Sequence, residues 1–289
     1  MTRAWSWLFS VVALGTLAAM VGIFAWQSVP VWRHEGWGYL SGAKWFFRQN
    51  EFGALPMIYG SIVVALVALV LAAPLGMSAA VFTAEYLPRG PRLAVKVLIE
   101  LLAGVPSVVY GLLGILLLRN WIYDLFARFD PLSGDTLLTA GVLLSVMILP
   151  TIVTLSDDAL RAVPAAQRRA ARALGLTRAE TILNVALPQA RRGLGAALLL
   201  ALGRSFGETI AVFLVVGRQD NNLPERWLSL QPLLESGQTL TSKLGSSETN
   251  ISWGDPLHWA AIVGLGLILL VLTGGLAVLG TSFARRSDA

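Results

Sequence analysis

Residues 164–188 read PAAQRRAARALGLTRAETILNVALP, a polar stretch that lies between long apolar segments. Pro164 suits the first turn of a helix, and the residues after it, 165–174, are rich in strong helix formers. Gly175 then supplies a left-handed stop. The first half of the stretch therefore predicts a short helix that ends in a tight turn.

The second half predicts another helix. Thr177 is followed three residues later by Glu180, a capping-box pattern that marks a helix start. We expect this helix to end at Leu187, because Pro188 follows it. The first helix carries arginines on one flank and a flat, small, apolar face on another. The residues of that face are Val163, Ala166, Ala170, Ala173 and Leu174.

The segments on both sides are long enough to cross a membrane. A spanning helix needs about 20 mostly apolar residues, and the chain is 55% hydrophobic and only 13% charged. The apolar runs lack the period-two alternation of barrel strands. The chain is therefore predicted to be an all-α polytopic membrane protein that lies in a lipid bilayer. Six segments qualify as transmembrane helices: 5–29, 56–84, 95–118, 136–155, 194–217 and 257–283.

The distribution of charge predicts the orientation of these segments. Lysine and arginine concentrate at both termini and in the second and fourth loops, and residues 156–193 alone hold seven arginines. The positive-inside rule places these parts, with both termini, in the cytoplasm. The net charge of +5 is thus a topology signal, and we expect no nucleic-acid partner. The absence of cysteine excludes a thiolate metal site and a cysteine nucleophile.

The chain divides into three parts. Residues 1–55 should form a first transmembrane helix, too long for a cleaved signal, and an aromatic-rich outer interfacial loop. Residues 56–283 should form a core of five transmembrane helices, with a cytoplasmic loop at 156–193. An outer loop at 218–256 is long enough to receive a soluble partner. Residues 284–289 would be a cytoplasmic tail.

The cytoplasmic helix pair has three possible roles: it could bind DNA, bind a protein, or only connect two spans. It is tethered to membrane spans at both ends and is too small to form a core of its own. These features favour a protein partner in the cytoplasm.

The helix pair resembles the signature of ABC-importer permease subunits, which is Glu-Ala-Ala, three residues, Gly, nine residues, Ile, any residue, Leu-Pro. The spacing matches throughout, but Arg169 stands where Glu is usual and Val185 where Ile is usual. The reversed charge leaves any contact of that Glu unassigned here. The resemblance implies that this loop couples to an ATPase. The residues concerned are Pro164, Arg169, Ala170, Ala171, Gly175, Val185, Leu187 and Pro188.

Two further stretches, 102–111 (LAGVPSVVYG) and 202–209 (LGRSFGET), resemble permease subunits of phosphate importers, more closely the PstC-type than its PstA-type paralogue. The resemblance implies a type I (MetI-like) fold in a bacterial inner membrane. It also implies a paralogous permease subunit, a cytoplasmic ATPase dimer and a periplasmic phosphate-binding protein as partners. Inorganic phosphate would cross by alternating access; another oxyanion or small solute is the alternative.

Nucleotide binding is expected elsewhere. The chain lacks the Gly-x-x-x-x-Gly-Lys-Ser/Thr pattern whose loop cradles nucleotide phosphates. We therefore expect this chain to bind no cofactor, and a partner chain to bind and hydrolyse ATP.

Two charges interrupt the predicted span 194–217. A central charge in a span costs about 2.5–3.5 kcal/mol. We therefore expect Arg204 and Glu208 either to pair with an opposite charge or to serve a function. Four residues apart, they can pair on one helix face. Arg204 could then offer its guanidinium to a passing oxyanion, with Glu208 tempering it. Alternatively, the two could form a structural ion pair between helices.

Gly104 and Pro106 should break or kink the predicted span 95–118. Backbone groups freed in mid-membrane are tolerated where they line a cavity. Ser107 and Tyr110 are therefore candidate polar groups of a substrate path, with plain packing as the alternative.

A remote alternative is an intramembrane serine hydrolase. Residues 203–207 match the Gly-x-Ser-x-Gly pattern around Ser205, and Asp255 and His258 follow in the order of a catalytic triad. That pattern requires a strand–turn–helix elbow, whereas here it lies within a predicted helix. With only two histidines, a metal site is not expected either.

Overall fold

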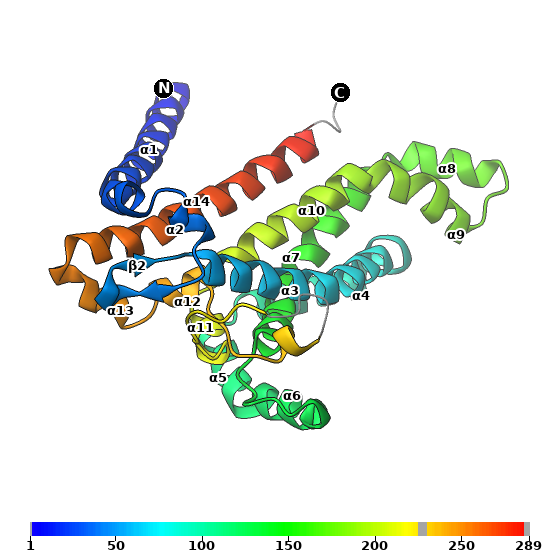
Figure 1. Ribbon diagram of the computed structural model, residues 1–289. Coiled ribbons are helices and arrows are strands. Elements are labelled where there is room, and N and C mark those ends of the chain that lie inside the picture. Colours follow the sequence, from blue (N-terminus) through cyan, green and yellow to red (C-terminus); the bar gives the residue numbers. More distant parts are fainter. Residues whose placement is uncertain (1, 225–229, 286–289) are drawn as a thin grey trace.

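The structure is a computed structural model that describes residues 2–224 and 230–285. Within them the chain is almost entirely helical, with one antiparallel hairpin of two short strands, β1 (Trp45–Phe46) and β2 (Glu51–Phe52) (Figure 1). The helices are α1 (Thr2–Glu35), α2 (Gly38–Ser41), α3 (Leu55–Val81), α4 (Arg89–Ala103), α5 (Ser107–Leu113), α6 (Arg119–Leu125), α7 (Leu137–Ala162), α8 (Ala165–Ala173), α9 (Arg178–Thr181), α10 (Leu187–Gly207), α11 (Ile210–Val215), α12 (Leu240–Leu244), α13 (Glu248–Ile251) and α14 (Pro256–Arg285). Three π-helical turns, Phe82–Tyr86, Gly114–Leu118 and Ile182–Ala186, adjoin α3, α5 and α9.

Five helical stretches in the described part are long and apolar enough to cross a membrane. They are Trp5–Glu35, Leu55–Tyr86, Ser107–Leu125, Leu137–Ala162 and Pro256–Phe283. The first runs further than the predicted end at residue 29, because Pro30 is accommodated inside α1. The predicted span 194–217 is wrong as one continuous helix, since the chain leaves the helix between α10 and α11.

The third predicted span, 95–118, is divided as expected. Helix α4 ends at Ala103, Pro106 is extended, and α5 begins at Ser107. The apolar stretch long enough to span therefore begins at Ser107 and not at Val95. Helix α4 itself is amphipathic, because Arg92 and Lys96 lie toward α7 while its leucines are exposed.

The core forms where α3 packs along α7, and α10 and α11 complete it. Helix α3 offers α7 small buried residues at intervals of four. They are Gly60, Val64, Ala68, Ala72 and Gly76. Small side chains at this spacing let two helix backbones approach closely, and Gly76 lies directly against Ile152 of α7.

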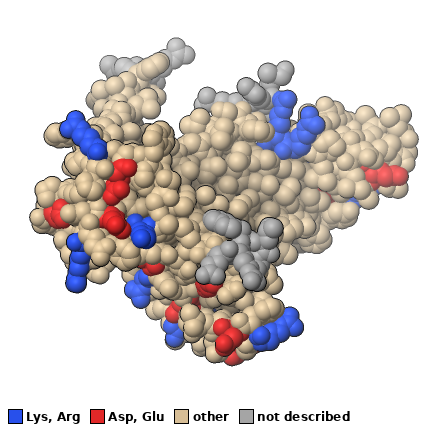
Figure 2. All heavy atoms as spheres, viewed as in Figure 1, with Lys and Arg blue, Asp and Glu red and all other residues tan. Residues whose placement is uncertain are grey.

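The two extremities of the molecule differ in character. Figure 1 shows α8 and α9 projecting at one end, and α13 with the hairpin at the other. Helix α1 lies at the edge of the bundle, where it packs against α14. On the face drawn in Figure 2, a broad uncharged area separates groups of charged side chains. Such an area suits contact with lipid.

Residues 30–55 are more than the interfacial loop that the sequence predicts. Trp45 and Phe52 are buried in a cluster that covers the N-terminal part of α14. The Tyr39 hydroxyl donates a hydrogen bond to the carbonyl of Ala261, at 2.7 Å. Among the aromatic residues of this segment, Trp37 is the most exposed, at 82%, and Phe46 is also exposed. The segment is thus part of the packed fold.

The predicted outer loop, 218–256, folds around a buried lysine; its residues 225–229 lie outside the described part. The ammonium of Lys243 is 2.7 Å from Asp220 and 2.6 Å from Glu248. Trp45 and His258 also hydrogen-bond Glu248. Burial raises the pKa of the Glu248 carboxyl, but the hydrogen bond and charge of Lys243 and the other two bonds outweigh it, so that pKa is lowered overall. The predicted tail, 284–289, begins inside α14, and residues 286–289 are not described.

Candidate coupling surface and translocation site

The helix pair predicted at 164–188 is present as α8 and α9. Gly175 takes a positive φ of 90° in the turn between them. The capping box also forms: the amide of Thr177 donates to the Glu180 carboxylate at 2.8 Å, and the amide of Glu180 donates to the Thr177 hydroxyl at 3.3 Å. The backbone and then the hydroxyl of Thr177 hold the pKa of the Glu180 carboxyl below its usual range. Local sequence thus determines this turn.

The prediction that the second helix ends at Leu187 is wrong. Helix α9 passes through the π-helical turn Ile182–Ala186 directly into α10, and Pro188 lies in the first turn of α10. The amide of Leu187 bonds to the carbonyl of Ile182, five residues back. Pro188 has no amide hydrogen, and its ring would clash with the preceding turn of a regular α-helix. The wider π-helical turn makes room for it. The helix pair is therefore continuous with a helix of the bundle.

One residue in the π-helical turn after α3, Glu85, holds the helix pair to the bundle. Glu85 is 8% exposed, and its carboxylate lies 2.9 Å from the guanidinium of Arg168 on α8. Arg178 of α9 donates to the backbone carbonyl of Glu85 and lies over the ring of Tyr86, 4.6 Å from its centroid. Both helices of the pair are therefore attached to the same point.

A second buried ion pair lies beside the first. Arg92 of α4 pairs with Asp157 near the end of α7, and the Thr83 hydroxyl donates to the same carboxylate at 3.2 Å. Asp157 is only 6% exposed. Leaving one partner of such a pair alone is strongly destabilising, whereas the satisfied pair holds α3, α4 and α7 together.

The outward surface of the helix pair is small and apolar. Leu174 at the tip is 82% exposed. The predicted coupling residues Pro164, Arg169, Ala170, Gly175 and Pro188 are exposed, Val185 and Leu187 are half-buried, and Ala171 is buried. Of the predicted apolar face, Ala166, Ala170, Ala173 and Leu174 are exposed, whereas Val163 is buried.

Arg204 and Glu208, in the middle of the bundle, do not form the pair on one helix face that the sequence predicts. No ion pair joins them among the described residues. The guanidinium of Arg204 donates to the Thr151 hydroxyl of α7, at 2.7 Å. Glu208 lies beyond the end of α10 in extended conformation, where its carboxylate accepts from the amide of Ala211 at 3.2 Å. The expected shared helix face does not exist, because the helix ends between the two residues.

The two interrupted spans meet. Gly111 of α5 lies against the backbone of Ala211 in α11, so the half-helices that follow the two breaks pack together. In the third span, Pro106 cannot donate to the carbonyl of Leu102, and the Tyr110 hydroxyl donates to it instead, at 2.9 Å. Ser107, half-buried, begins α5. Discontinuous helices of this kind place backbone polar groups in mid-membrane.

Comparison with known proteins identifies the family. Residues 72–287 match the model described as "Binding-protein-dependent transport system inner membrane component". The chain belongs to this family. The permease protein PstC of Mesorhizobium japonicum is 31% identical over 96% of this chain and 86% of that protein. PstC 2 of Mycobacterium tuberculosis is 36% identical over 78% of this chain and 72% of its own length. Both are named phosphate transport system permease proteins.

A third relative and a solved structure agree. The Bacillus subtilis protein named "Probable ABC transporter permease protein YqgH" is 35% identical over 92% of this chain and 83% of that protein. The MetNI methionine ABC transporter, in an inward-facing conformation, aligns with a TM-score of 0.57 at 17% identity, covering 80% of this chain and 94% of that one. This likeness bears out the predicted type I (MetI-like) importer permease fold.

The serine-hydrolase pattern does not assemble in this member of the permease family. Ser205 lies within helix α10 and donates its hydroxyl to the carbonyl of Leu202, at 2.7 Å. His258 is buried at the other end of the pattern, where its Nε2 meets Glu248 at 2.8 Å. Asp255 accepts the amide of His258 at the start of α14. Each group thus has a structural partner, and the geometry lacks a serine–histidine hydrogen bond.

Three residues at the base of the helix pair and beside Arg204 were not predicted from the sequence: Glu85, Thr151 and Asp157. Each meets its partner across a long stretch of chain, as with Glu85 and Arg168. For Glu85 and Asp157, the sequence offers one signal: a carboxylate near the end of an apolar segment is costly unless it is paired. Thr151 gives no such signal.

Proposed function

We propose that this chain is the membrane-spanning permease subunit of an ATP-driven importer that moves inorganic phosphate across a bacterial inner membrane. The observation that carries the proposal is the similarity, over most of both chains, to proteins named phosphate transport system permeases. The guanidinium of Arg204 has no carboxylate partner in the part of the chain that the structure describes and donates to a hydroxyl, which supports an anionic cargo. Other oxyanions share that chemistry and are the competing cargoes.

The chain would not catalyse ATP hydrolysis itself. It carries no phosphate-cradling nucleotide loop, and the alanine face of α8 and α9 offers a flat docking surface for a cytoplasmic ATPase dimer. A paralogous permease subunit would complete the channel, and a periplasmic phosphate-binding protein would deliver the cargo. ATP binding and release would then bias the bundle between its inward and outward states.

Arg204 would be the residue of this subunit that contacts the cargo. Its guanidinium would be held by the Thr151 hydroxyl and not by Glu208. Ser107 and Tyr110 remain candidate path residues at the neighbouring break. A transport site should bind weakly enough to release its cargo, and a single guanidinium meets that requirement.

Uptake of radiolabelled phosphate into vesicles that contain all subunits tests the cargo. We expect ATP-dependent uptake that unlabelled phosphate competes and sulfate does not. A transporter with a hydrolysis-deficient ATPase serves as the control. Uptake of sulfate in preference to phosphate, or phosphate uptake that persists without this chain, would contradict the proposal.

The proposed orientation, with both termini and α8 in the cytoplasm, has a clean test because the chain lacks cysteine. A single cysteine at exposed Arg169 should react with a membrane-impermeant maleimide only in inverted vesicles. A cysteine at exposed Asn50 is the matched control and should react only in intact cells. The opposite pattern would overturn the orientation, and with it the assignment of α8 to ATPase docking.

A further inference from the structure

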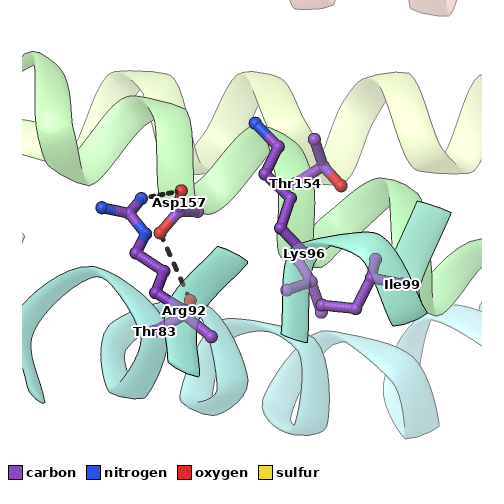
Figure 3. A pocket seen from close by; sticks show the side chains of 7 residues that line it. Thr83, Arg92, Lys96, Ile99, Thr154 and Asp157 are labelled. Atoms are coloured by element: carbon purple, nitrogen blue, oxygen red, sulfur yellow. Dashed lines mark hydrogen bonds and ion pairs between the residues drawn. The ribbon is translucent and has the colours of Figure 1, made fainter. Parts of the chain in front are cut away.

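A small cavity lies beside α7, between α4 and the cytoplasmic end of α3. Lys96 of α4 and Thr154 of α7 line it, together with the paired residues Arg92 and Asp157. Figure 3 shows Arg92 turned toward Asp157, whereas Lys96 extends along the face of α7 that carries Thr154. The cavity thus has one neutralised charge pair and one separate ammonium group.

Lys96 has no counterion in the described part of the chain. Glu100, four residues later on α4, is the partner that spacing alone favours, but it is exposed and forms no ion pair there. Asp157 is already occupied by Arg92 and by the Thr83 hydroxyl. A half-buried ammonium without a carboxylate retains its full capacity to attract an anion.

The Thr154 hydroxyl is also free among the described residues. Threonines elsewhere in the spanning helices donate to their own backbone, as Thr273 does to Leu269 at 2.8 Å and Thr281 to Ala277 at 2.9 Å. Thr154 makes no such bond, so its hydroxyl can donate to a ligand oxygen. Lys96 and Thr154 therefore offer two unused donors on one wall.

Their position continues the proposed path. Thr151, the partner of Arg204, precedes Thr154 by three residues on α7, which is a rise of about 4.5 Å toward the end that leads into α8. A cation and a hydroxyl at one level are thus followed by a cation and a hydroxyl at the next. Thr151 and Thr154 are both half-buried on α7.

We propose that Lys96 and Thr154 form a second oxyanion-binding site, on the cytoplasmic side of Arg204, through which inorganic phosphate leaves the bundle. This inference rests on the proposed function. The ammonium supplies a mobile point charge, the hydroxyl supplies a directed donor, and both bind phosphate oxygens without the grip of a guanidinium fork. Neighbouring sites of moderate strength let an ion enter one while it leaves the other.

Phosphate protection of an introduced cysteine tests the site without relying on transport. In the complete, otherwise cysteine-free complex, Thr154→Cys leaves Lys96 in place. Inorganic phosphate should slow its modification by an anionic thiol reagent, relative to chloride at equal ionic strength. The Lys96→Gln, Thr154→Cys double variant should lose this protection, whereas Glu100→Gln, Thr154→Cys should keep it. Absent protection, or equal protection in all three proteins, would overturn the proposal.

A lipid phosphate group has the same chemistry, so the lipid must be varied. Protection that follows the fraction of anionic lipid in the vesicle, and not the concentration of inorganic phosphate, would assign the site to lipid and overturn the proposal. Uptake by the same complexes separates the two hypotheses. Lys96→Gln should reduce phosphate uptake about tenfold and Lys96→Arg should restore most of it. Normal uptake in Lys96→Gln rejects the second site alone, whereas no phosphate uptake by the unmodified transporter rejects the proposed function.

Discussion

The base of the helix pair and the middle of the bundle treat charge in opposite ways. At the base, Glu85 and Asp157 are buried and each is paired with an arginine. In the middle, Arg204 donates to the hydroxyl of Thr151 and forms no ion pair with a carboxylate among the described residues. Paired charges hold elements together, whereas a cation that meets only hydroxyls remains able to bind an anion. The presence or absence of a partner thus separates structural charges from candidate cargo contacts.

The largest effect is expected at the exposed surface of the helix pair. Ala170→Glu should abolish co-purification of the ATPase, because an unpaired charge buried in an interface costs about 3–5 kcal/mol. Ala170 is preferable to Gly175, whose positive φ would add strain to any side chain placed there.

Gln189→Glu is the matched control, since Gln189 is exposed on α10 beyond the helix pair. It should leave the amount of bound ATPase unchanged. Retention of the ATPase by the Ala170→Glu protein would show that this face is not the docking surface.

The next effect concerns the paired charges. Asp157→Asn leaves Arg92 buried without a counterion and should lower the free energy of unfolding by about 3–5 kcal/mol. Thermal unfolding of the purified chain in detergent measures it. Asp158→Asn, at the exposed neighbouring position, should change little. If both variants unfold alike, the Asp157 pair is not a structural element.

A smaller effect is expected at the break in the third span. Tyr110→Phe removes the hydroxyl that bonds the carbonyl of Leu102 and should cost about 1 kcal/mol. The amide of Val105 also reaches that carbonyl, at 3.3 Å, which limits the loss. Tyr123→Phe, which removes an exposed hydroxyl, is the control in the same unfolding assay. A loss of uptake without a loss of stability would instead place Tyr110 in the path.

Local chemistry made much of this fold predictable. Gly104 and Pro106, which lacks an amide hydrogen, together predict the break before α5. Thr177 and Glu180 cap each other across three residues, and Gly175 supplies the turn. Such features depend on neighbours in the chain, and the structure has them where the sequence predicts them.

Features that depend on distant partners were out of reach. The break at Glu208 is stabilised by the Thr241 hydroxyl, which donates to the Glu208 carbonyl from the far side of the outer loop, at 2.9 Å. The composition of residues 194–217 does not reveal that contact, and by itself it predicts one continuous span. At Pro188 the error was the reverse: the sequence predicts a helix end there, but a π-helical turn accommodates the proline inside a continuous helix. The partners of Arg168 and Arg204 likewise come from other helices.

Phosphate uptake by the Arg204→Gln transporter tests the central claim most directly, which is that a cation without a carboxylate partner contacts the cargo. Glutamine can still bond the Thr151 hydroxyl, so assembly and stability should remain normal. Uptake should fall about 10- to 100-fold, because a hydrogen bond to a charged group is lost, and Arg204→Lys should recover part of it. Unchanged uptake, or a loss of assembly equal to the loss of uptake, would contradict the account.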